Sequence, residues 1–286
     1  MTTAFDYDIA FSRNIGWVTE TEQQQLSSKR VAIAGMGGVG GFHLLTLARL
    51  GVGKFNIADL DTFELANFNR QAGAGMSSID QRKVEVLARM ARDINPDCEI
   101  NIFPQGVNDA NLVEFMTGVD LYVDGLDFFA FQAREAMFRH CAAAGIPATT
   151  VAPLGMSAAL LNFMPGGMNF ESYFQLEGRP EMEKALRFLI GLAPALLHRP
   201  YLADETRVNL KARKGPSTIM ACMLCAGVAA SEALKILLGR GKVWAAPHGI
   251  QFDGYRNRVA HTWRPGGNRH PINRLAIAIA RRQLGC

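Results

Sequence analysis

The sequence predicts an α/β protein with a doubly wound, mainly parallel sheet and helices on both faces. Apolar stretches typical of buried strands alternate with amphipathic helical stretches through the first half of the chain. A glycine-rich turn follows the first of these strands and opens a helix, which is the junction found in Rossmann-like folds. Hydrophobic residues make up 49% of the 286 residues, enough to cover both faces of a sheet within one large domain.

The first elements predict a nucleotide-binding unit. After a short helix over Thr19–Leu26, the strand Val31–Ala34 leads into a G-x-G-x-x-G turn, where the backbone and the N–H groups of the next helix can approach phosphate. A second strand, Lys54–Ala58, ends in Asp59, about 20 residues after the turn, where an acid can accept hydrogen bonds from a ribose. This arrangement fits NAD as well as ATP. The turn glycines are Gly35, Gly37, Gly38 and Gly40.

The remaining elements continue the β-α rhythm, each predicted from the period of its apolar residues. Strands are expected at Glu99–Phe103, Val119–Val123, Ile146–Val151 and Ser157–Phe163, and helices at Lys83–Ile94, Asn108–Met116, Asp127–Cys141, Glu181–Leu189 and Pro271–Leu284. The chain divides into an N-terminal helical segment (1–28), a nucleotide-binding Rossmann-like domain (29–163), a crossover loop or helical lid (164–216), a helix and hairpin that complete the same domain (217–263), and a basic C-terminal helix (264–286).

A cluster of polar residues after Asp59 distinguishes between the two nucleotides. Asp61 is followed by Asn67, Arg70 and Gln71, and Lys83 comes after a Gly/Ser-rich loop. A dehydrogenase has no use for this cluster. An Arg and a Lys beside a triphosphate would neutralise charge that develops at the α-phosphate and on departing pyrophosphate. The cluster therefore favours ATP.

The order of these motifs resembles the signature of the ThiF/MoeB/HesA family, the ubiquitin-activating-enzyme-like adenylyltransferases. That signature reads G-x-G-G-x-G, D-x-D, N-x-x-R-Q and a Lys, which here are Gly35 to Gly40, Asp59 and Asp61, Asn67 to Gln71, and Lys83. The resemblance covers most of the chain. It implies a sheet that turns from parallel to antiparallel strands after its first half, with ATP and magnesium as cofactors.

The sequence Asp124-Gly125-Leu126-Asp127 follows the next strand, at the carboxyl edge where doubly wound folds bind ligands. The resembled family has D-x-x-D-N here, and its second acid, which would be Asp127, holds magnesium on the phosphates. A carboxylate beside a triphosphate suits magnesium, and Asp124 is expected among the nucleotide-binding residues. Phe128 replaces the family's Asn, so the neighbouring contact to substrate is expected to differ. Alternatively, Asp127 caps the following helix.

Arg13 is the residue of interest in the N-terminal segment. In the resembled family, an arginine in an R-Q-I-like sequence at this place reaches into the ATP site of the partner subunit, and Arg13-Asn14-Ile15 occupies the matching position. The resemblance therefore implies a homodimer in which Arg13 is donated across the interface, where its charge would stabilise the transferring phosphoryl group. The alternative is an ordinary surface arginine.

Composition limits the setting and the partners. The N-terminus has no basic region followed by an apolar run, so we expect no signal peptide, no membrane attachment and a cytoplasmic location. Five cysteines suit a reducing compartment, and the single C-x-x-C, Cys222 and Cys225, cannot complete a four-ligand site, so no structural zinc is expected. The residues after Asp253 include seven arginines and no acid, so they contribute a charge of +7. Because the formal net charge of the whole chain is +4, residues 1–253 carry a net charge of −3. These arginines either pair with acids elsewhere or dock an acidic partner, a small protein or RNA.

The resemblance implies ATP-dependent adenylation of a substrate carboxylate with release of pyrophosphate. A carboxylate with a pKa of about 4 is already ionised at neutral pH, so alignment and charge neutralisation suffice. The catalytic residues would be Arg70, Lys83, Arg13 and Asp127, with Asn67 and Gln71 orienting the group. The first acceptor is the C-terminal Gly-Gly of a small ubiquitin-like or sulfur-carrier protein. A modified tRNA base, as in the threonylcarbamoyladenosine dehydratases, and a peptide or metabolite stay open.

Two hypotheses come from other classes of protein. An NAD-dependent oxidoreductase leaves Asn67, Arg70 and Lys83 without a role, and tight NAD binding without ATP binding would support it. A non-catalytic, nucleotide-gated binding module would bind ATP without adenylating any acceptor, although the motif residues here are intact.

Overall fold

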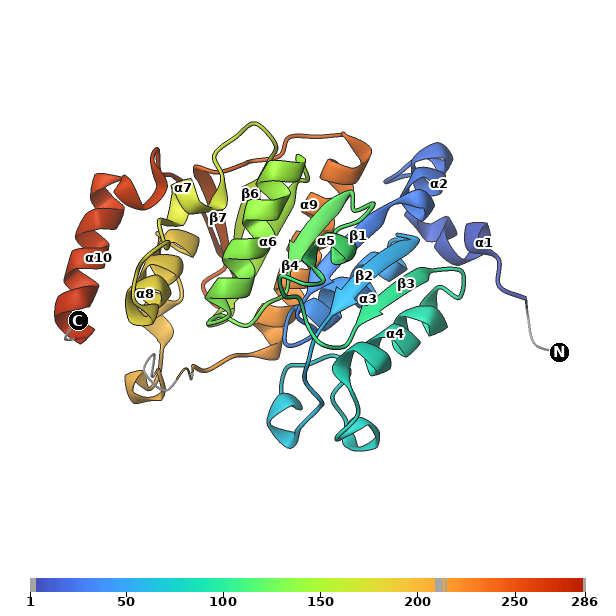
Figure 1. Cartoon of the computed structure of the whole chain (residues 1–286), viewed down its shortest axis with the longest axis horizontal. Helices are drawn as coiled ribbons and strands as arrows, with labels where there is room; N and C mark the ends of the chain where they lie inside the picture. Colours follow the sequence, from blue (N-terminus) through green and yellow to red (C-terminus); the bar gives the residue numbers. More distant parts are fainter. Residues whose placement is uncertain (1–3, 209–212, 214, 285–286) are drawn as a thin grey trace.

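One mixed sheet of eight strands organises the protein (Figure 1). The computed structural model describes residues 4–208, 213 and 215–284. The strand order is β3-β2-β1-β4-β5-β6-β7-β8; the first five in this order are parallel, and β6, β7 and β8 continue antiparallel. The predicted change of direction is confirmed. The strands are Arg30–Ala34 (β1), Lys54–Ala58 (β2), Glu99–Phe103 (β3), Leu121–Asp124 (β4), Ala148–Leu154 (β5), Ser157–Phe163 (β6), His248–Asp253 (β7) and Arg258–Trp263 (β8).

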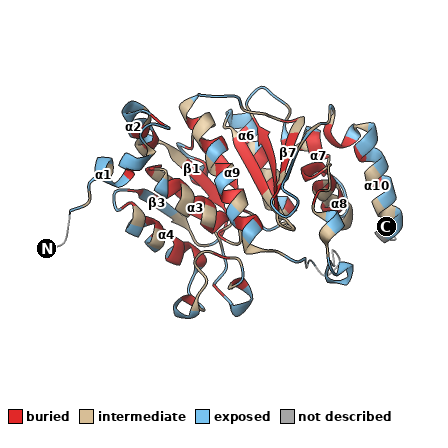
Figure 2. Cartoon of the chain, turned by 180° about the vertical axis from the view of Figure 1, so that it is seen from behind, coloured by how far each residue is buried: buried red, intermediate tan, exposed pale blue. Residues whose placement is uncertain are grey.

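Two cores lie on opposite faces of this sheet, because successive strand residues point to opposite sides. Val31 and Ile33 of β1 belong to one core, and Ala32 and Ala34 belong to the other. Helices α3 (Gly40–Arg49), α4 (Lys83–Ile94) and α9 (Ile219–Leu238) contribute to the first core. Helices α5 (Leu112–Phe115), α6 (Phe131–Ala144), α7 (Phe170–Phe174) and α8 (Glu181–Leu192) contribute to the second. The predicted helices on both faces are confirmed (Figures 1 and 2).

The turn between β1 and α3 requires glycine at two positions for steric reasons. Gly35 has a φ of +87°, and a Cβ at this residue would lie 2.2 Å from the carbonyl oxygen of Gly125. A Cβ on Gly40 would lie 1.7 Å from the carbonyl oxygen of Gly35. A side chain at Gly35 would separate the ends of β1 and β4, and one at Gly40 would separate the start of α3 from the end of β1, so both glycines are needed for the close packing of the turn.

Helix α9 is the element whose composition is most ambiguous. Among the described residues, it is the one helix long and apolar enough to cross a membrane. The structure instead packs it along β5, β6 and α3, with Cys222 and Cys225 fully buried, while Met220 and Met223 stay exposed (Figure 2). It is therefore a core helix with one exposed edge, as its small buried residues predict.

Two helix boundaries differ from the sequence prediction. Helix α5 begins at Leu112 instead of Asn108, because the side chains of Asn108 and Asn111 hydrogen-bond to nearby backbone groups and form a turn there. Helix α6 begins at Phe131 instead of Asp127, and residues 126–130 form a separate loop. The alternative that Asp127 caps this helix was therefore wrong. Helices α1 (Tyr7–Phe11) and α7 were not predicted.

The two ends of the chain pack at opposite ends of the molecule (Figure 1). Helix α2 (Glu20–Ser28) begins with the predicted capping box of Thr19 and Glu22. Helix α10 (Pro271–Leu284) packs on α8, where Ile277 contacts the core formed with Leu186 and Ile190. Arg281 forms an ion pair with Glu183, so the interpretation that the arginines of the tail pair with acids is confirmed for this residue.

Candidate functional site

The candidate site lies at the carboxyl ends of β1 and β2, around the glycine turn. The side chain of Asp59 accepts a hydrogen bond from the Met36 N–H at 2.6 Å through Oδ2 and one from the Asp61 N–H at 2.8 Å through Oδ1. Burial raises the pKa of Asp59 above its ordinary value, although these two N–H groups and the Lys83 ammonium act in the opposite direction. Each carboxylate oxygen can still accept another hydrogen bond, as a ribose hydroxyl requires.

The loop that follows β2 brings Lys83 and Asp61 together. Lys83 Nζ lies 2.9 Å from Asp61 Oδ2, with the lysine side chain only 7% exposed and the aspartate 56% exposed. Asp61, which was predicted to bind the nucleotide, thus holds the amine of Lys83.

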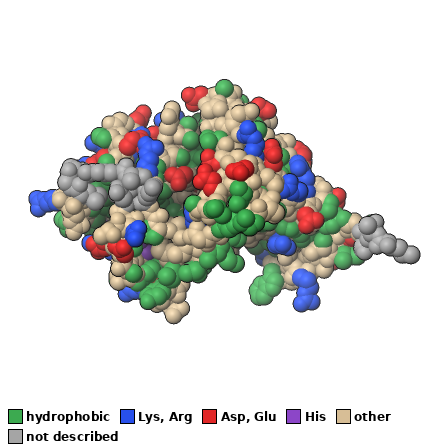
Figure 3. Space-filling view, turned by 90° about the horizontal axis from the view of Figure 1, so that it is seen from below, with side chains coloured by type: hydrophobic (Ala, Val, Ile, Leu, Met, Phe, Trp, Pro, Cys, Tyr) green, Lys and Arg blue, Asp and Glu red, His purple; other side chains and the backbone are tan. Residues whose placement is uncertain are grey.

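On the underside of the molecule, where the loop of residues 59–82 projects, acidic side chains gather beside hydrophobic ones (Figures 1 and 3).

Arg70 and Gln71 reach the glycine turn from the same loop. A Cβ on Gly38 would lie 3.9 Å from Cγ and Cδ of Arg70, and one on Gly37 would lie 3.8 Å from Nε2 of Gln71. Gln71 is 8% exposed, and its buried Oε1 has no hydrogen-bond partner among the described residues. An orphaned buried polar atom beside a glycine turn indicates a ligand at this point. Asn67 is buried, and its Oδ1 accepts the N–H of Glu64 at 3.0 Å, which shapes the loop.

Asp124, which was predicted to bind the nucleotide, is held by contacts within the protein. Asp124 is 3% exposed, and its Oδ2 accepts hydrogen bonds from Arg134 Nε at 2.8 Å and from the Thr150 hydroxyl at 2.9 Å. Its Oδ1 accepts the Leu126 N–H at 3.2 Å. These contacts direct the carboxylate into the protein and give Asp124 a structural role at the end of β4; its contact with the nucleotide stays a prediction.

Asp127 remains a suitable magnesium ligand. Its side chain is exposed on the loop after β4, and only Oδ1 accepts a hydrogen bond within the described residues, from the Phe129 N–H at 2.9 Å. Among those residues, no group of three or more His, Cys, Asp or Glu side chains could hold a metal by itself. A magnesium ion here would therefore take its other ligands from phosphate and water.

Arg134 is a residue of this region that sequence reasoning missed as a functional candidate. It lies one helical turn into α6, is 2% exposed, and donates hydrogen bonds to three carbonyl oxygens of the loop after β4. A charged residue on an otherwise apolar helix face was the available signal. Phe128, which replaces the family's Asn, has its ring centroid 5.3 Å from that of Phe188 in α8, so it takes part in core packing.

Arg13 cannot reach the glycine turn of its own chain. The 3-10 helix that carries it (Ser12–Asn14) is tied to the far end of α3, because Asn14 Nδ2 donates to the carbonyl oxygen of Leu50 at 3.3 Å. The ten residues of α3 span about 15 Å between that end and the turn. The exposed Arg13 side chain therefore fits a role in another copy of the chain or at the surface.

Cys222 packs directly against the glycine turn, since a Cβ on Gly38 would lie 3.3 Å from its Sγ. Burial raises the pKa of both the Cys222 and the Cys225 thiols. Neutral, fully buried thiols are poor nucleophiles and poor metal ligands, which favours a packing role for this C-x-x-C sequence.

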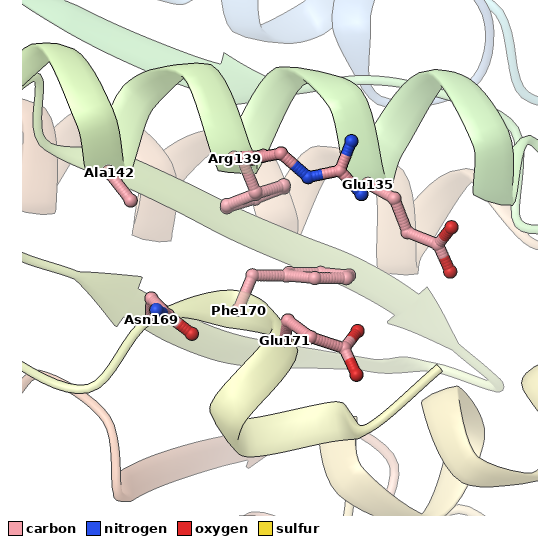
Figure 4. A pocket seen from close by; sticks show the side chains of 7 residues that line it. Glu135, Arg139, Ala142, Asn169, Phe170 and Glu171 are labelled. Atoms are coloured by element: carbon pink, nitrogen blue, oxygen red, sulfur yellow. The ribbon is translucent and has the colours of Figure 1, made fainter. Parts of the chain in front are cut away.

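Two surface hollows lie beside helix α6 in the described part of the chain. One of about 80 Å³ lies between α6 and α7, where Arg139 and Phe170 lie between Glu135 and Asn169 (Figure 4). Its acids already serve the fold, since Glu135 binds Lys184 and Glu171 accepts backbone N–H groups. A larger hollow of about 210 Å³ lies between the loop after β3 and the first turns of α6 and is lined by Val107, Asn108, Asp109, Leu112, Gln132, Ala133 and Ala136.

Comparison with known proteins finds one family across this chain and several relatives that match about half of it. A profile described as "ThiF family" matches residues 11–272. The tRNA threonylcarbamoyladenosine dehydratase of Bacillus subtilis (strain 168) is 32% identical over 138 residues, which is 48% of this chain and 54% of the relative. The molybdopterin-synthase adenylyltransferase of Escherichia coli (strain K12) is 32% identical over 141 residues, 49% of this chain and 56% of the relative.

A solved structure described as SeMet PaaA has the same fold. It is 17% identical, with a TM-score of 0.67, over 92% of this chain and 77% of that chain. The chain spans about half the length of the curated relatives it matches. The sequence similarity to these relatives therefore covers about half of this chain, and the fold similarity extends over nearly all of it.

Proposed function

Because this chain belongs to the ThiF family, we propose that it transfers the adenylyl group of ATP to a substrate carboxylate and releases pyrophosphate. The observation that carries this proposal is the glycine turn with its surroundings. The turn is close to Arg70 and to Gln71, whose buried Oε1 has no hydrogen-bond partner among the described residues, and its Met36 N–H donates to Asp59. These groups suit a phosphate and a ribose.

The residues present account for the steps of adenylation. A carboxylate oxygen of the acceptor attacks the α-phosphorus of ATP, and the bond from that phosphorus to the bridging oxygen breaks, so that pyrophosphate leaves with the electron pair. Asp59 would bind the ribose, and the purine would occupy the hollow between the loop after β3 and α6. Arg70 and Lys83 would offset the negative charge that develops in the transition state. A magnesium ion on Asp127 would neutralise phosphate charge.

For the acceptor, we propose the C-terminal Gly-Gly of a small ubiquitin-like or sulfur-carrier protein. Relatives named molybdopterin-synthase adenylyltransferase and SAMP-activating enzyme E1 support this class. A tRNA base that bears a carboxylate is the second candidate, because three relatives are named tRNA threonylcarbamoyladenosine dehydratase and exposed arginines such as Arg269 and Arg274 would suit phosphate. A peptide or metabolite is a third acceptor that the same experiment would detect.

The buried free thiols fit a cytoplasmic location, which we also propose.

We propose a homodimer in which Arg13 completes the site of the partner. Arg13 cannot serve its own turn, and large apolar side chains are exposed around it, with Trp17 85% exposed and Ile15 40%. Met220 and Met223 of α9, near Arg70 and the turn, are 50% and 59% exposed. Arg240 Nη2 donates to the Trp17 carbonyl oxygen, so the far end of α9 and the N-terminal segment share one surface. A second copy on this surface would cover these apolar groups.

Magnesium-dependent ATP–pyrophosphate exchange tests the function. The assay would contain separate small-protein, RNA and metabolite fractions, with Arg70→Ala as the inactive control. Exchange stimulated by the small-protein fraction is the expected result, and stimulation by RNA alone would move the acceptor to a tRNA base. ATP binding without exchange in any fraction would support a nucleotide-gated binding module instead.

Mixed-variant complementation tests the dimer. Arg13→Ala and Lys83→Ala would each be inactive, and mixing them would restore about a quarter of the activity per site if Arg13 acts in the partner's site. A mixture as inactive as the two separate variants, in a protein shown to be a dimer by light scattering, would contradict the donation of Arg13.

A further inference from the structure

The loop after β4 is held in place by one buried guanidinium. Nη2 of Arg134 donates to the carbonyl oxygens of Leu126 at 2.8 Å and Asp127 at 2.9 Å, and Nη1 donates to that of Phe128 at 3.2 Å. Three consecutive carbonyls thus point at the same side chain. Because Asp127 is the middle residue, the direction in which its carboxylate projects depends on this contact.

The start of the loop is fixed by the same arginine through Asp124. The carboxylate of Asp124 binds Arg134 Nε at 2.8 Å, and it also accepts the Thr150 hydroxyl from the neighbouring strand β5. The Gly125 N–H donates to the carbonyl oxygen of Ala34 at 2.9 Å, which joins the loop to the glycine turn. Arg134 therefore links the glycine turn, the acid expected to bind magnesium and helix α6.

Helix α8 covers this arginine. The Cζ atom of Arg134 lies 4.6 Å from the ring centroid of Phe188, and Phe188 is 1% exposed. The ring of Phe188 also lies 5.3 Å from that of Phe128 in the loop and 5.8 Å from that of Phe131 at the start of α6. Lys184 of α8 binds Glu135 of α6 at 2.9 and 3.0 Å, which fixes the two helices side by side (Figure 1).

We propose that Arg134 and Phe188 are positioning residues through which α8 controls the order of residues 125–130 and the affinity of the site for magnesium nucleotide. This inference rests on the proposed adenylation. Helix α8 packs in the second core beside this arginine, so a displacement of α8 changes the packing of Phe188 on Arg134. Groups that orient a metal ligand without touching the metal commonly change metal affinity by about 10–100-fold when they are replaced.

Hydrogen–deuterium exchange of the full-length protein tests the mechanical part of the proposal. In Phe188→Leu and Arg134→Lys, we expect faster exchange of the amides in residues 125–130, where Gly125, Leu126, Phe129 and Ala130 donate hydrogen bonds. Phe174→Leu is the matched control, because Phe174 is fully buried and its ring lies 5.0 Å from that of Phe188, without a contact to Arg134 among the described residues. Exchange in this segment that is no faster in Phe188→Leu than in Phe174→Leu would overturn the proposal.

Calorimetric titration with ATP at several magnesium concentrations tests the functional part. We expect Phe188→Leu to weaken ATP binding about tenfold at low magnesium and to approach the wild type at high magnesium. Phe174→Leu should bind as the wild type does, even where its melting temperature is lower. Equal weakening at every magnesium concentration would overturn the link to the metal. Wild-type protein that does not bind ATP would refute the proposed function, whereas the exchange comparison would still decide the role of Arg134 and Phe188.

Discussion

The loops after β2 and β4 flank the glycine turn, and an acid stands at the start of the first loop and at the end of the strand before the second, but the two acids differ in environment. Asp59 is partly exposed and receives N–H groups from the turn and from its own loop. Asp124 is 3% exposed and paired with a buried arginine. An acid after a buried strand therefore indicates the edge of the sheet where ligands bind, while the partners from other elements decide whether that acid meets the ligand or supports the loop.

The largest expected effect comes from removing the cation of the buried pair. Arg134→Met leaves the carboxylate of Asp124 buried without its cationic partner, so the free energy of unfolding should fall by about 3–5 kcal/mol. Urea unfolding followed by circular dichroism measures this change. The matched control is Lys29→Met, which breaks a partly exposed pair with Asp120 and should cost no more than about 1 kcal/mol. Equal costs for the two variants would remove the distinction between the two acids.

A substitution in the loop after β2 should lower turnover and leave the stability of the protein unchanged. Arg70→Ala is expected to lower the rate of ATP–pyrophosphate exchange by at least about a hundredfold, on the order of 3 kcal/mol of transition-state stabilisation. Its free energy of unfolding should stay close to that of the wild type, because Arg70 bonds only to Ala66 and Asn69 of its own loop among the described residues. Arg49→Ala, at the exposed far end of α3, is the control. Full activity of Arg70→Ala would exclude this residue from the mechanism.

A smaller effect, on ATP affinity, is expected for Asp59→Asn. The loss of one charge-assisted hydrogen bond should weaken binding about tenfold, or about 1.5 kcal/mol, in a calorimetric titration. Burial raises the pKa of Asp59 above 3.8, so as the pH falls its charged form is lost earlier than that of an exposed aspartate. Wild-type affinity should therefore begin to fall at a higher pH than the titration of an exposed aspartate would produce, and the affinity of Asp59→Asn should change less over the same range. Parallel pH profiles would show that another group is responsible.

The smallest effect concerns the support that α9 gives to the turn. Gly38→Ala should lower the free energy of unfolding by about 1 kcal/mol, because the new Cβ would lie 3.3 Å from Sγ of Cys222. Adding Cys222→Ala should relieve part of this cost, since the two positions are in contact. A double-mutant cycle from urea unfolding measures the coupling between them. Strict additivity of the two substitutions would contradict the packing of α9 against the turn.

The local elements were largely predictable from the sequence. The bounds of β2, β3, β6 and α4 agree with the prediction, because each has a strong apolar period and ends at a glycine, a proline or a polar residue. The start of α6 was not predictable, because residues 126–130 have no helix-breaking residue. Their loop exists because Arg134, Asp124 and Phe188, which lie on three different elements, hold it.

The sequence by itself determined the parallel half of the sheet, the glycine turn and the grouping of Asp59, Arg70 and Lys83 around it, because the carboxyl ends of parallel strands meet at one edge. The tertiary structure decided which acids face that edge. It buried Asp124 against Arg134, paired Asp61 with Lys83 and placed Arg13 beyond the reach of its own turn. The reason is physical: a spacing in the sequence fixes where a residue leaves its strand or helix, whereas its charge partner and its exposure depend on elements that are distant along the chain.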